Sequence, residues 1–339
     1  MLSRHFLRAK VLQIVYATLS AGEKGTATAR TAFDRNIDRL NELGALQIIS
    51  LQEVVAAGNK IIEEGLRKHL PSQEDLSPTR LIVDNPFLEM LFNNYDFAAM
   101  KDKYLFPWEL HDDVMRKVYT TFRKSPKFKE YLSLETRTAE DDQRMVLNLF
   151  KHIINMSDFR DIFAERSLLW EDDFDQVAQY NYAMLKAIDP ELFDGSTPLR
   201  YMIDERDEVD MEALRFSHTL LTESLTHVAE NEQLIKNHLV NWDFDRVAFM
   251  DIIIINMGIA ELTACPSIPE RVTVDECIEL SKEFSSDKSK IFVNGIIDKL
   301  IVELRSAGRI NKSGRGLYVP GVEDEDDLSQ GPIDVAHFS

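Results

Sequence analysis

The first ten residues carry four basic side chains and no acid, namely Arg4, His5, Arg8 and Lys10. Basic side chains grouped on one helix face can bind phosphate, so one interpretation is an arm that contacts nucleic acid. The alternative is a solvated face of an amphipathic helix, and these residues leave both open. The excess is informative because the whole chain has 58 acidic residues against 39 lysines and arginines, a net charge of −19. Such a chain needs a local basic patch or a basic partner to bind nucleic acid.

Other residue types that support chemistry do not have the spacing of known enzyme sites. Residues 314–316 (GRG) lack the Lys-Ser/Thr ending of a phosphate-binding loop. His218 and His227 are nine residues apart, which does not place them on one helix face. Cys265 and Cys277 have no nearby histidine, and we interpret them as small buried side chains. The sequence therefore predicts a binding protein that is not an enzyme, with no catalytic residue, no metal ligand and no cofactor.

The elements that position these residues are predicted to be helices, because apolar residues repeat at helical spacing and no segment shows strand alternation. Residues 249–262 are apolar on nearly every side, which is typical of a helix at the centre of a bundle. The many aromatic residues between 79 and 135 indicate the core of a small domain rather than base-stacking residues. We expect two helices between 26 and 70 that separate near Gly44, and further helices over 1–20, 139–188, 211–239, 243–262, 273–284 and 288–305.

Three further segments bear on organisation and compartment. We interpret residues 190–210 as a linker whose acids are solvated, although a carboxylate cluster can also bind a hard cation. Residues 319–339 contain five consecutive acids and are predicted to be a disordered tail. The N-terminus lacks a signal peptide, no apolar run is long enough to cross a membrane, and two cysteines make no disulfide framework. These features favour the cytoplasm.

Two stretches of the sequence resemble each other. They are WEDDFDQVA, which begins at Trp170, and WDFDRVA, which begins at Trp242, about 72 residues later. Each stretch follows two predicted helices. Chance likeness between amphipathic helices is the simpler explanation, and an internal duplication stays open.

Residues 270–299 predict two helices around a polar elbow. Thr273 and Glu276 have the spacing of a capping box at the start of the first helix, and residues 285–287 (SSD) offer N-cap oxygens to the second. Within the second helix, Gly295 costs about 1 kcal/mol relative to alanine. We expect the close approach of another part of the chain or of a ligand to compensate, and we favour packing.

Several stretches of this sequence resemble the NusB family of transcription antitermination factors. The N-terminal match is weak by itself, whereas the C-terminal matches are specific. The resemblance covers about residues 1–20 and 211–305. The matching stretches are residues 7–16 (LRAKVLQIVY), 260–262 (AEL), 268–272 (IPERV), 275–284 (DECIELSKEF) and 291–299 (IFVNGIIDK).

The resemblance implies a bundle of two three-helix halves with a large helical insertion after the first helix. We expect residues 1–22 and 208–318 to form the NusB-like domain, 23–207 the insertion and 319–339 the tail. It also implies partners: ribosomal protein NusE, single-stranded RNA of the boxA type, and the transcription elongation complex on ribosomal RNA operons. A basic partner such as NusE suits so acidic a chain.

The resemblance also implies site residues by their place in the motifs. Asp251 falls where the family has an acid that meets the protein partner, and a carboxylate suits a basic partner. A small basic patch with two aromatic side chains suits single-stranded RNA, whose unpaired bases stack on such rings. Two departures from the family pattern are a diluted arginine run at residues 4–8 and Ile291 in place of a lysine. The implied RNA-binding residues are Arg4, Arg8, Tyr16, Lys288, Lys290, Phe292 and Asn294.

Two alternative functions stay open. NusB-like domains also precede RNA cytosine methyltransferases, but the match here ends near residue 305 and no glycine-rich cofactor loop is present. The other alternative is a structural adaptor whose insertion holds another protein and which does not bind RNA.

Overall fold

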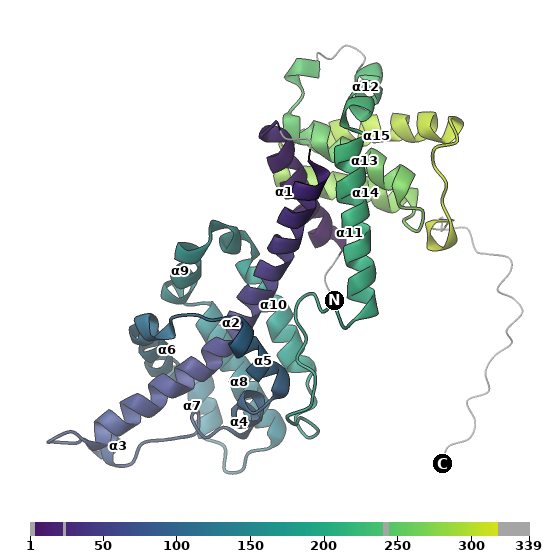
Figure 1. The fold of residues 1–339 in the computed structure, drawn as a ribbon. Coiled ribbons are helices and arrows are strands. Elements are labelled where there is room, and N and C mark those ends of the chain that lie inside the picture. The colour runs from purple at the N-terminus through teal and green to yellow at the C-terminus, as the bar shows by residue number, and fades with distance from the viewer. Residues whose placement is uncertain (1–3, 23–24, 240–243, 318–339) are drawn as a thin grey trace, which may run out of the picture. The chain divides into compact units, whose positions relative to one another are not determined.

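Figure 1 shows the computed structural model of this chain, which describes residues 4–22, 25–239 and 244–317. Within these residues every regular element is a helix and none is a strand, so the all-α prediction is confirmed. The predicted acidic tail, residues 319–339, lies outside the described residues, as does Trp242. The chain divides into a middle unit, Asp34–Met211, and a terminal unit, Ser3–Phe33 with Glu212–Ser339. We describe each unit by itself.

The middle unit contains most of α2 and all of the elements from α3 to α10. Four of its short helices follow an N-cap residue whose side chain accepts a hydrogen bond from a backbone amide of the first turn. At the start of α4, for example, Asn85 accepts a hydrogen bond from the Leu88 amide. The elements are α2 (Thr26–Leu66), α3 (Gln73–Leu76), α4 (Pro86–Phe92), α5 (Tyr95–Lys103), a 3-10 turn (Trp108–His111), α6 (Asp112–Lys124), α7 (Pro126–Leu132), α8 (Ala139–Ile154), α9 (Ser157–Arg166) and α10 (Leu168–Ala187).

The helix α2 is continuous, whereas we expected two helices that separate near Gly44. A Cβ atom at Gly44 would lie 3.5 Å from Val177 Cγ1, because α10 packs closely against α2 there. Asn181 of α10 donates hydrogen bonds to the Gly44 carbonyl at 3.0 Å and to Gln47 Oε1 at 3.1 Å. The glycine therefore gives space to a neighbouring helix and does not end its own.

The aromatic side chains between residues 79 and 135 form part of the core of the middle unit, as expected. Tyr95 is an exception and is 76% exposed. Gly58 of α2 makes room for one of these rings, since a Cβ there would lie 2.4 Å from Tyr119 Cε2. The buried members are Phe87, Phe97, Tyr104, Trp108, Tyr119, Phe122, Phe128 and Tyr131.

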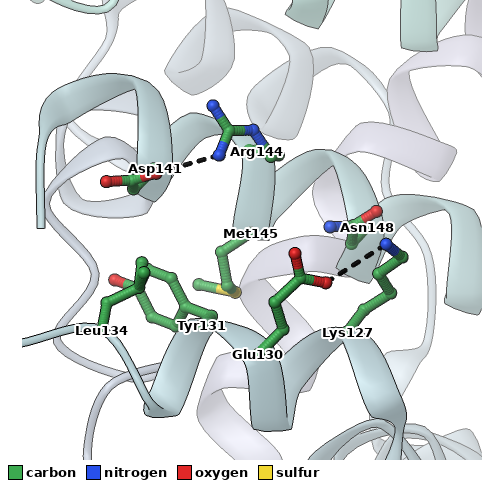
Figure 2. A pocket seen from close by; sticks show the side chains of 8 residues that line it. All are labelled: Lys127, Glu130, Tyr131, Leu134, Asp141, Arg144, Met145 and Asn148. Carbon is green, nitrogen blue, oxygen red and sulfur yellow. Dashed lines mark hydrogen bonds and ion pairs between the residues drawn. The ribbon is translucent and has the colours of Figure 1, made fainter.

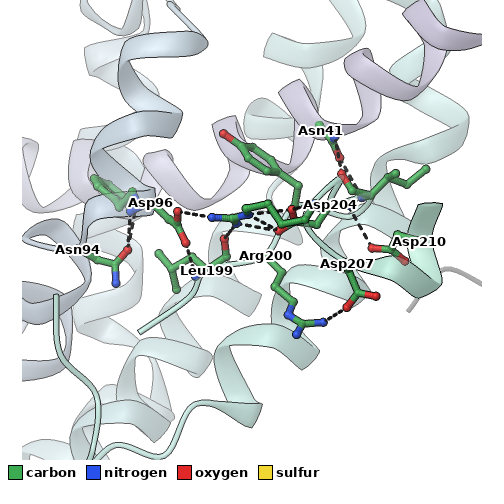
Figure 3. Close-up of polar contacts among 12 residues, drawn as sticks. Asn41, Asn94, Asp96, Leu199, Arg200, Asp204, Asp207 and Asp210 are labelled. Atoms are coloured by element: carbon green, nitrogen blue, oxygen red, sulfur yellow. Dashed lines mark hydrogen bonds and ion pairs between the residues drawn. The ribbon is translucent and has the colours of Figure 1, made fainter. Parts of the chain in front are cut away.

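The segment that we expected to be a solvated linker is fixed by polar contacts (Figure 3). Asp204 is only 4% exposed, and it accepts hydrogen bonds of 2.7 to 3.1 Å from the Arg206 guanidinium. Those bonds lower the pKa of Asp204. Asp96 of α5 accepts a bond from the same guanidinium at 2.8 Å and another from the Leu199 amide at 2.9 Å. The expectation of solvated acids is thus wrong for Asp204, because an arginine two residues away neutralises it inside the fold.

The terminal unit brings the first helix of the chain together with the last five. Its elements are α1 (Arg4–Ser20), the start of α2, α11 (Glu208–Thr226), α12 (Val228–His238), a 3-10 turn (Phe244–Arg246), α13 (Phe249–Ala264), α14 (Glu270–Phe284), α15 (Ser289–Ser306) and a 3-10 turn (Gly314–Leu317). Where one helix was expected over residues 211–239, α11 and α12 separate at His227.

The helix α13 is the centre of the terminal unit, as its apolar sequence predicted. Twelve consecutive residues from Asp251 to Leu262 are buried, and α1, α12, α14 and α15 all pack against this helix (Figure 1). Gly258 marks the closest packing, since a Cβ there would lie 3.0 Å from Cys277 Sγ and 3.3 Å from Ile297 Cδ1. Both cysteines are free and buried, in agreement with their interpretation as small core side chains.

The packing that we expected at Gly295 is not found. This glycine is exposed on α15, and a Cβ there would meet no heavy atom of the described residues within 4 Å. The glycine that allows helices to approach closely is Gly258, on a different helix. Gly295 therefore leaves the surface of α15 open to a molecule from outside the chain.

The elbow between α14 and α15 also differs from the predicted capping pattern. The helix α14 begins at Glu270, so Thr273 is buried within it, and its hydroxyl donates to Glu261 Oε1 at 2.8 Å. The predicted capping box of Thr273 and Glu276 is wrong, because the N-cap of α14 is Pro269, four residues before Thr273. At the start of α15, residue Lys288 is the N-cap and makes no side-chain capping bond.

Candidate functional site

The elbow before α15 presents basic side chains to solvent. The hydroxyls of Ser285 and Ser286 lie 3.0 and 2.8 Å from Ser289 Oγ, and these contacts fix the turn that leads into the helix. Lys288 and Lys290 are exposed, and within the described part of the chain no carboxylate lies at ion-pair distance from either. The elbow can therefore bind an anion without first losing an internal salt bridge.

Three neighbouring residues complete this surface of α15. Phe292 and Asn294 are partly exposed, and Ile291 is 74% exposed. Gly295 adds a place without a side chain on the same helix. The four predicted residues of the elbow, Lys288 and Lys290 with Phe292 and Asn294, are thus all at least partly exposed, as are Ile291 and Gly295.

Arg4 lies at the start of α1 and is partly exposed. Its Nη2 donates to Glu212 Oε1 at 2.9 Å. About a third of the Arg4 side chain and a somewhat larger fraction of the Glu212 side chain are exposed to solvent. Its guanidinium also lies 5.6 Å from the centre of the Phe216 ring. Because exposed ion pairs contribute little, this contact leaves Arg4 available to a stronger anion.

Arg8 has a different position from the one that the resemblance implies. Its side chain is 2% exposed, and it donates two hydrogen bonds to Glu261 at 2.7 and 2.8 Å. Burial opposes the charge of the guanidinium, but the bonds to Glu261 outweigh it and raise the pKa of Arg8. A buried side chain offers no surface to RNA, so we correct its assignment to a residue that joins α1 to α13. Its partner Glu261 was not singled out as a charge partner from sequence.

His5 joins α1 to α14 through two carboxylates. Its Nδ1 lies 2.8 Å from Glu276 Oε2, and its Nε2 lies 3.1 Å from Glu283 Oε2. Burial lowers the pKa of His5, but the hydrogen bonds with Glu276 and Glu283 outweigh it and raise the pKa overall. Since carboxylates only accept hydrogen bonds, this arrangement needs both ring nitrogens protonated.

Tyr16 lies beside the start of α13. Its ring centre is 5.8 Å from that of Phe249, and each of the two residues is 42% exposed. Asp251, two residues further along α13, is 5% exposed, and its Oδ1 has no hydrogen-bond partner among the described residues. A buried carboxylate oxygen without a donor is costly, so this place suits a donor from another molecule.

The basic residues after α15 are used within the terminal unit. Arg309 pairs with Glu230 at 2.8 Å, and Arg315 contacts Glu212 at 3.3 Å. Lys312 donates to the carbonyl oxygens of Cys265 and Glu261, at 3.1 and 3.4 Å, and so satisfies the end of α13. This stretch therefore fixes the C-terminal segment.

The described residues contain no group of three or more His, Cys, Asp or Glu side chains that could hold a metal ion. In the same part of the chain, no helix has the length and apolar character needed to cross a membrane.

The fold and this surface define an all-α protein with a helical bundle assembled from both ends of its chain. Comparison with known proteins identifies the bundle: the sequence model described as "NusB family" matches residues 175–301. This chain belongs to the NusB family. No solved structure matches the chain significantly.

Three relatives show how much of the chain the likeness covers. The chain is 39% identical over 102 residues to the transcription antitermination protein NusB of Salinibacter ruber, which is 30% of this chain and 64% of that protein. It is 34% identical over 116 residues to NusB of Chloroherpeton thalassium, covering 34% and 55%, respectively. It is 37% identical over 101 residues to NusB of Myxococcus xanthus, covering 30% and 72%. The match thus spans less than two thirds of the first two relatives, and most of this longer chain has no counterpart in the alignments.

Proposed function

We propose that this protein is a transcription antitermination factor that binds boxA-type single-stranded RNA together with ribosomal protein NusE. In this proposal it supports transcription of ribosomal RNA in the cytoplasm, as part of the elongation complex, and it acts by binding, without catalysis. The observation that carries the proposal is the exposed elbow of a NusB-family bundle, where Lys288 and Lys290 have no ion-pair partner among the described residues.

The proposed RNA surface comprises Arg4, Lys288, Lys290, Phe292 and Asn294. The lysines supply positive charge near phosphate, Phe292 supplies a ring for stacking, and Asn294 supplies a donor and an acceptor for a base edge. Gly295 supports the proposal because open space beside it allows a base or a backbone to come close to α15. Arg8 is left out because it is buried.

The proposed protein-partner surface comprises Asp251 with Tyr16 and Phe249. An exposed pair of aromatic rings and a buried carboxylate in the first turn of the same helix suit an apolar contact with a single cationic anchor. The resemblance implied an RNA contact for Tyr16, but its ring lies against Phe249 at the start of the helix that carries Asp251. We therefore propose that Tyr16 contacts the protein partner, for which a basic ribosomal protein has the matching charge.

The division of the chain is part of the proposal. We propose that residues 1–22 and 208–318 act as the NusB-like domain, with 23–207 as an insertion. The family match begins earlier, at residue 175, in α10. Nothing in the geometry of the described residues of the middle unit favours the methyltransferase alternative.

The proposal is tested by binding of the full chain, with and without purified NusE, to a boxA-type RNA and to a scrambled RNA of the same length and composition. We expect the complex with NusE to prefer the boxA-type RNA. The variant K288Q/K290Q should lose affinity for it, whereas Lys299→Gln, also exposed on α15, should have little effect. Equal affinity of the complex for both RNAs would show that the proposed function is wrong. If K288Q/K290Q binds RNA as tightly as the wild type does, the elbow is not part of the RNA-binding site.

A further inference from the structure

The strongest local basic charge of this acidic chain lies in the middle unit, outside the surfaces described so far. From Arg116 to Lys129 the sequence has six lysines and arginines and no acid. The stretch covers most of α6 and the first half of α7. A segment with this much positive charge is unusual in a chain of net charge −19. We therefore ask which of its basic side chains are paired within the fold and which are exposed.

The first two of these basic residues are used within the fold. Arg116 forms hydrogen bonds with Glu64 of α2 at 2.6 and 2.8 Å, and with Asp112. Lys117 forms an ion pair with Asp158 of α9. These contacts join α6 to its neighbours, and they leave the excess charge at the junction of α6 and α7.

The three lysines of the junction project into solvent. Lys124 and Lys129 are exposed, and among the described residues no carboxylate lies at ion-pair distance from either. Lys127 is 63% exposed, and its only ion pair within the described ranges is with the exposed Glu130, one helical turn along α7 (Figure 2). An exposed pair at this spacing is weak, so it does not withdraw Lys127 from an anionic ligand. We call Lys124, Lys127 and Lys129 the junction lysines.

The aromatic side chains of the same two helices face inward. Tyr119, Phe122, Phe128 and Tyr131 are all buried, with 1 to 6% of each side chain exposed. The junction therefore offers charge without an exposed ring for base stacking and without the aromatic anchors that dominate protein interfaces. A pocket between α7 and α8 is lined by Lys127, Tyr131 and Arg144 and has a volume of about 70 Å³ (Figure 2).

We propose that the junction lysines bind the phosphate backbone of a single-stranded RNA without regard to its sequence. Charge without stacking groups fits phosphate contacts, which position a strand but do not read its bases. An acidic protein is the less suitable ligand, because lysine is depleted at the core of protein interfaces and Leu132 is the only large apolar side chain exposed on the described residues of α6 and α7. The surface would hold RNA that extends beyond a short recognition sequence, a role that rests on the proposed RNA-binding function.

The test uses the full chain and a long single-stranded RNA of arbitrary sequence that contains no boxA-type element. We compare wild type, the variant K124Q/K127Q/K129Q, and the matched control Lys186→Gln, whose exposed lysine on α10 also has no ion pair in the described residues. Each phosphate contact to a single strand contributes about 0.7 to the slope of log affinity against log salt, so the slope of the triple variant should be shallower by about 2. Its affinity at low salt should fall at least tenfold, and the control should match wild type.

A triple variant with wild-type affinity and an unchanged salt slope would overturn the proposal. So would a variant that keeps its RNA affinity but loses affinity for poly-glutamate, since that result identifies an acidic polypeptide as the ligand. The outcome is separate from that of the proposed function, which is judged on a short boxA-type RNA with NusE. If the complex with NusE shows no preference for boxA-type RNA but the triple variant still binds the long RNA more weakly, the proposed function is wrong and the role of the junction lysines is supported.

Discussion

Arg8 and Glu261 form a buried ion pair with two hydrogen bonds of 2.7 and 2.8 Å, between residues 253 positions apart in the chain. Thr273 of α14 donates a further bond to the same carboxylate at 2.8 Å. Glu276 lies 3.5 Å from the arginine, on the side nearer to solvent. This contact joins α1, α13 and α14, so the basic residue that resembles an RNA ligand in the sequence instead connects the two ends of the terminal unit.

Replacing Arg8 with methionine should strongly destabilise the protein, because Glu261 would remain buried without its counter-charge. The expected loss is about 3–5 kcal/mol in the free energy of unfolding, measured with urea. Arg4→Gln serves as the control, since its pair with Glu212 is partly exposed and its loss should cost less than about 1 kcal/mol. A variant R8M with wild-type stability and reduced RNA affinity would restore Arg8 to the RNA site.

Replacing His5 with glutamine should reduce stability mainly at low pH. The pKa of His5 is raised in the folded protein, where it lies between Glu276 and Glu283. Its stabilising contribution is therefore fully present below the unfolded pKa of about 6.5 and is lost as the pH rises through the folded value.

The measurement is the difference in unfolding free energy between wild type and H5Q across this range of pH. The other charged groups near His5 are Arg8 on the same helix and the acids Asp275 and Glu279, which line the same surface pocket, and all three are present in both proteins that are compared. A difference that grows as the pH rises would contradict the proposed charged state of His5.

Two glycines of the terminal unit should respond in opposite directions to alanine. At Gly295 the added methyl group meets open space, so G295A should stabilise α15 by up to about 1 kcal/mol. At Gly258 it would lie 3.0 Å from Cys277 Sγ, so G258A should destabilise the bundle by about 1–3 kcal/mol. Thermal unfolding distinguishes the two, and a destabilising G295A would mean that this face of α15 is covered.

Replacing Asp251 with asparagine should weaken binding of the protein partner far more than it changes stability. The Oδ1 atom of this buried carboxylate has no partner in the described residues, so little internal pairing is lost. A carboxylate in the first turn of a helix interacts favourably with the helix dipole. Losing this interaction at the start of α13 should lower the free energy of unfolding by no more than about 1 kcal/mol. Affinity for NusE should fall by more than about tenfold, corresponding to the loss of a desolvated charge pair.

Calorimetry with the wild type, D251N and Asp298→Asn makes the comparison. Asp298 is an exposed acid on α15 and serves as the control. If D251N binds NusE as the wild type does, the partner surface lies elsewhere.

The sequence alone determined those features that depend on local periodicity. Helical spacing predicted an all-α chain, and the nearly continuous apolar run of α13 predicted its place at the centre of a bundle. The motifs at residues 275–284 and 291–299 were by themselves specific enough to indicate the NusB family. Lys288 and Lys290 were singled out by their place between these motifs, and the folded chain leaves both of them exposed.

Only the tertiary structure decided the roles of individual charges and glycines. The periodicity of α1 cannot distinguish an arginine that faces RNA from one that meets Glu261, because the partner is 253 residues away. Gly44, Gly258 and Gly295 look alike in sequence, yet neighbouring helices approach the first two and leave the third open. Burial and pairing are properties of surfaces that meet in the folded chain, and these are set by contacts that no local pattern contains.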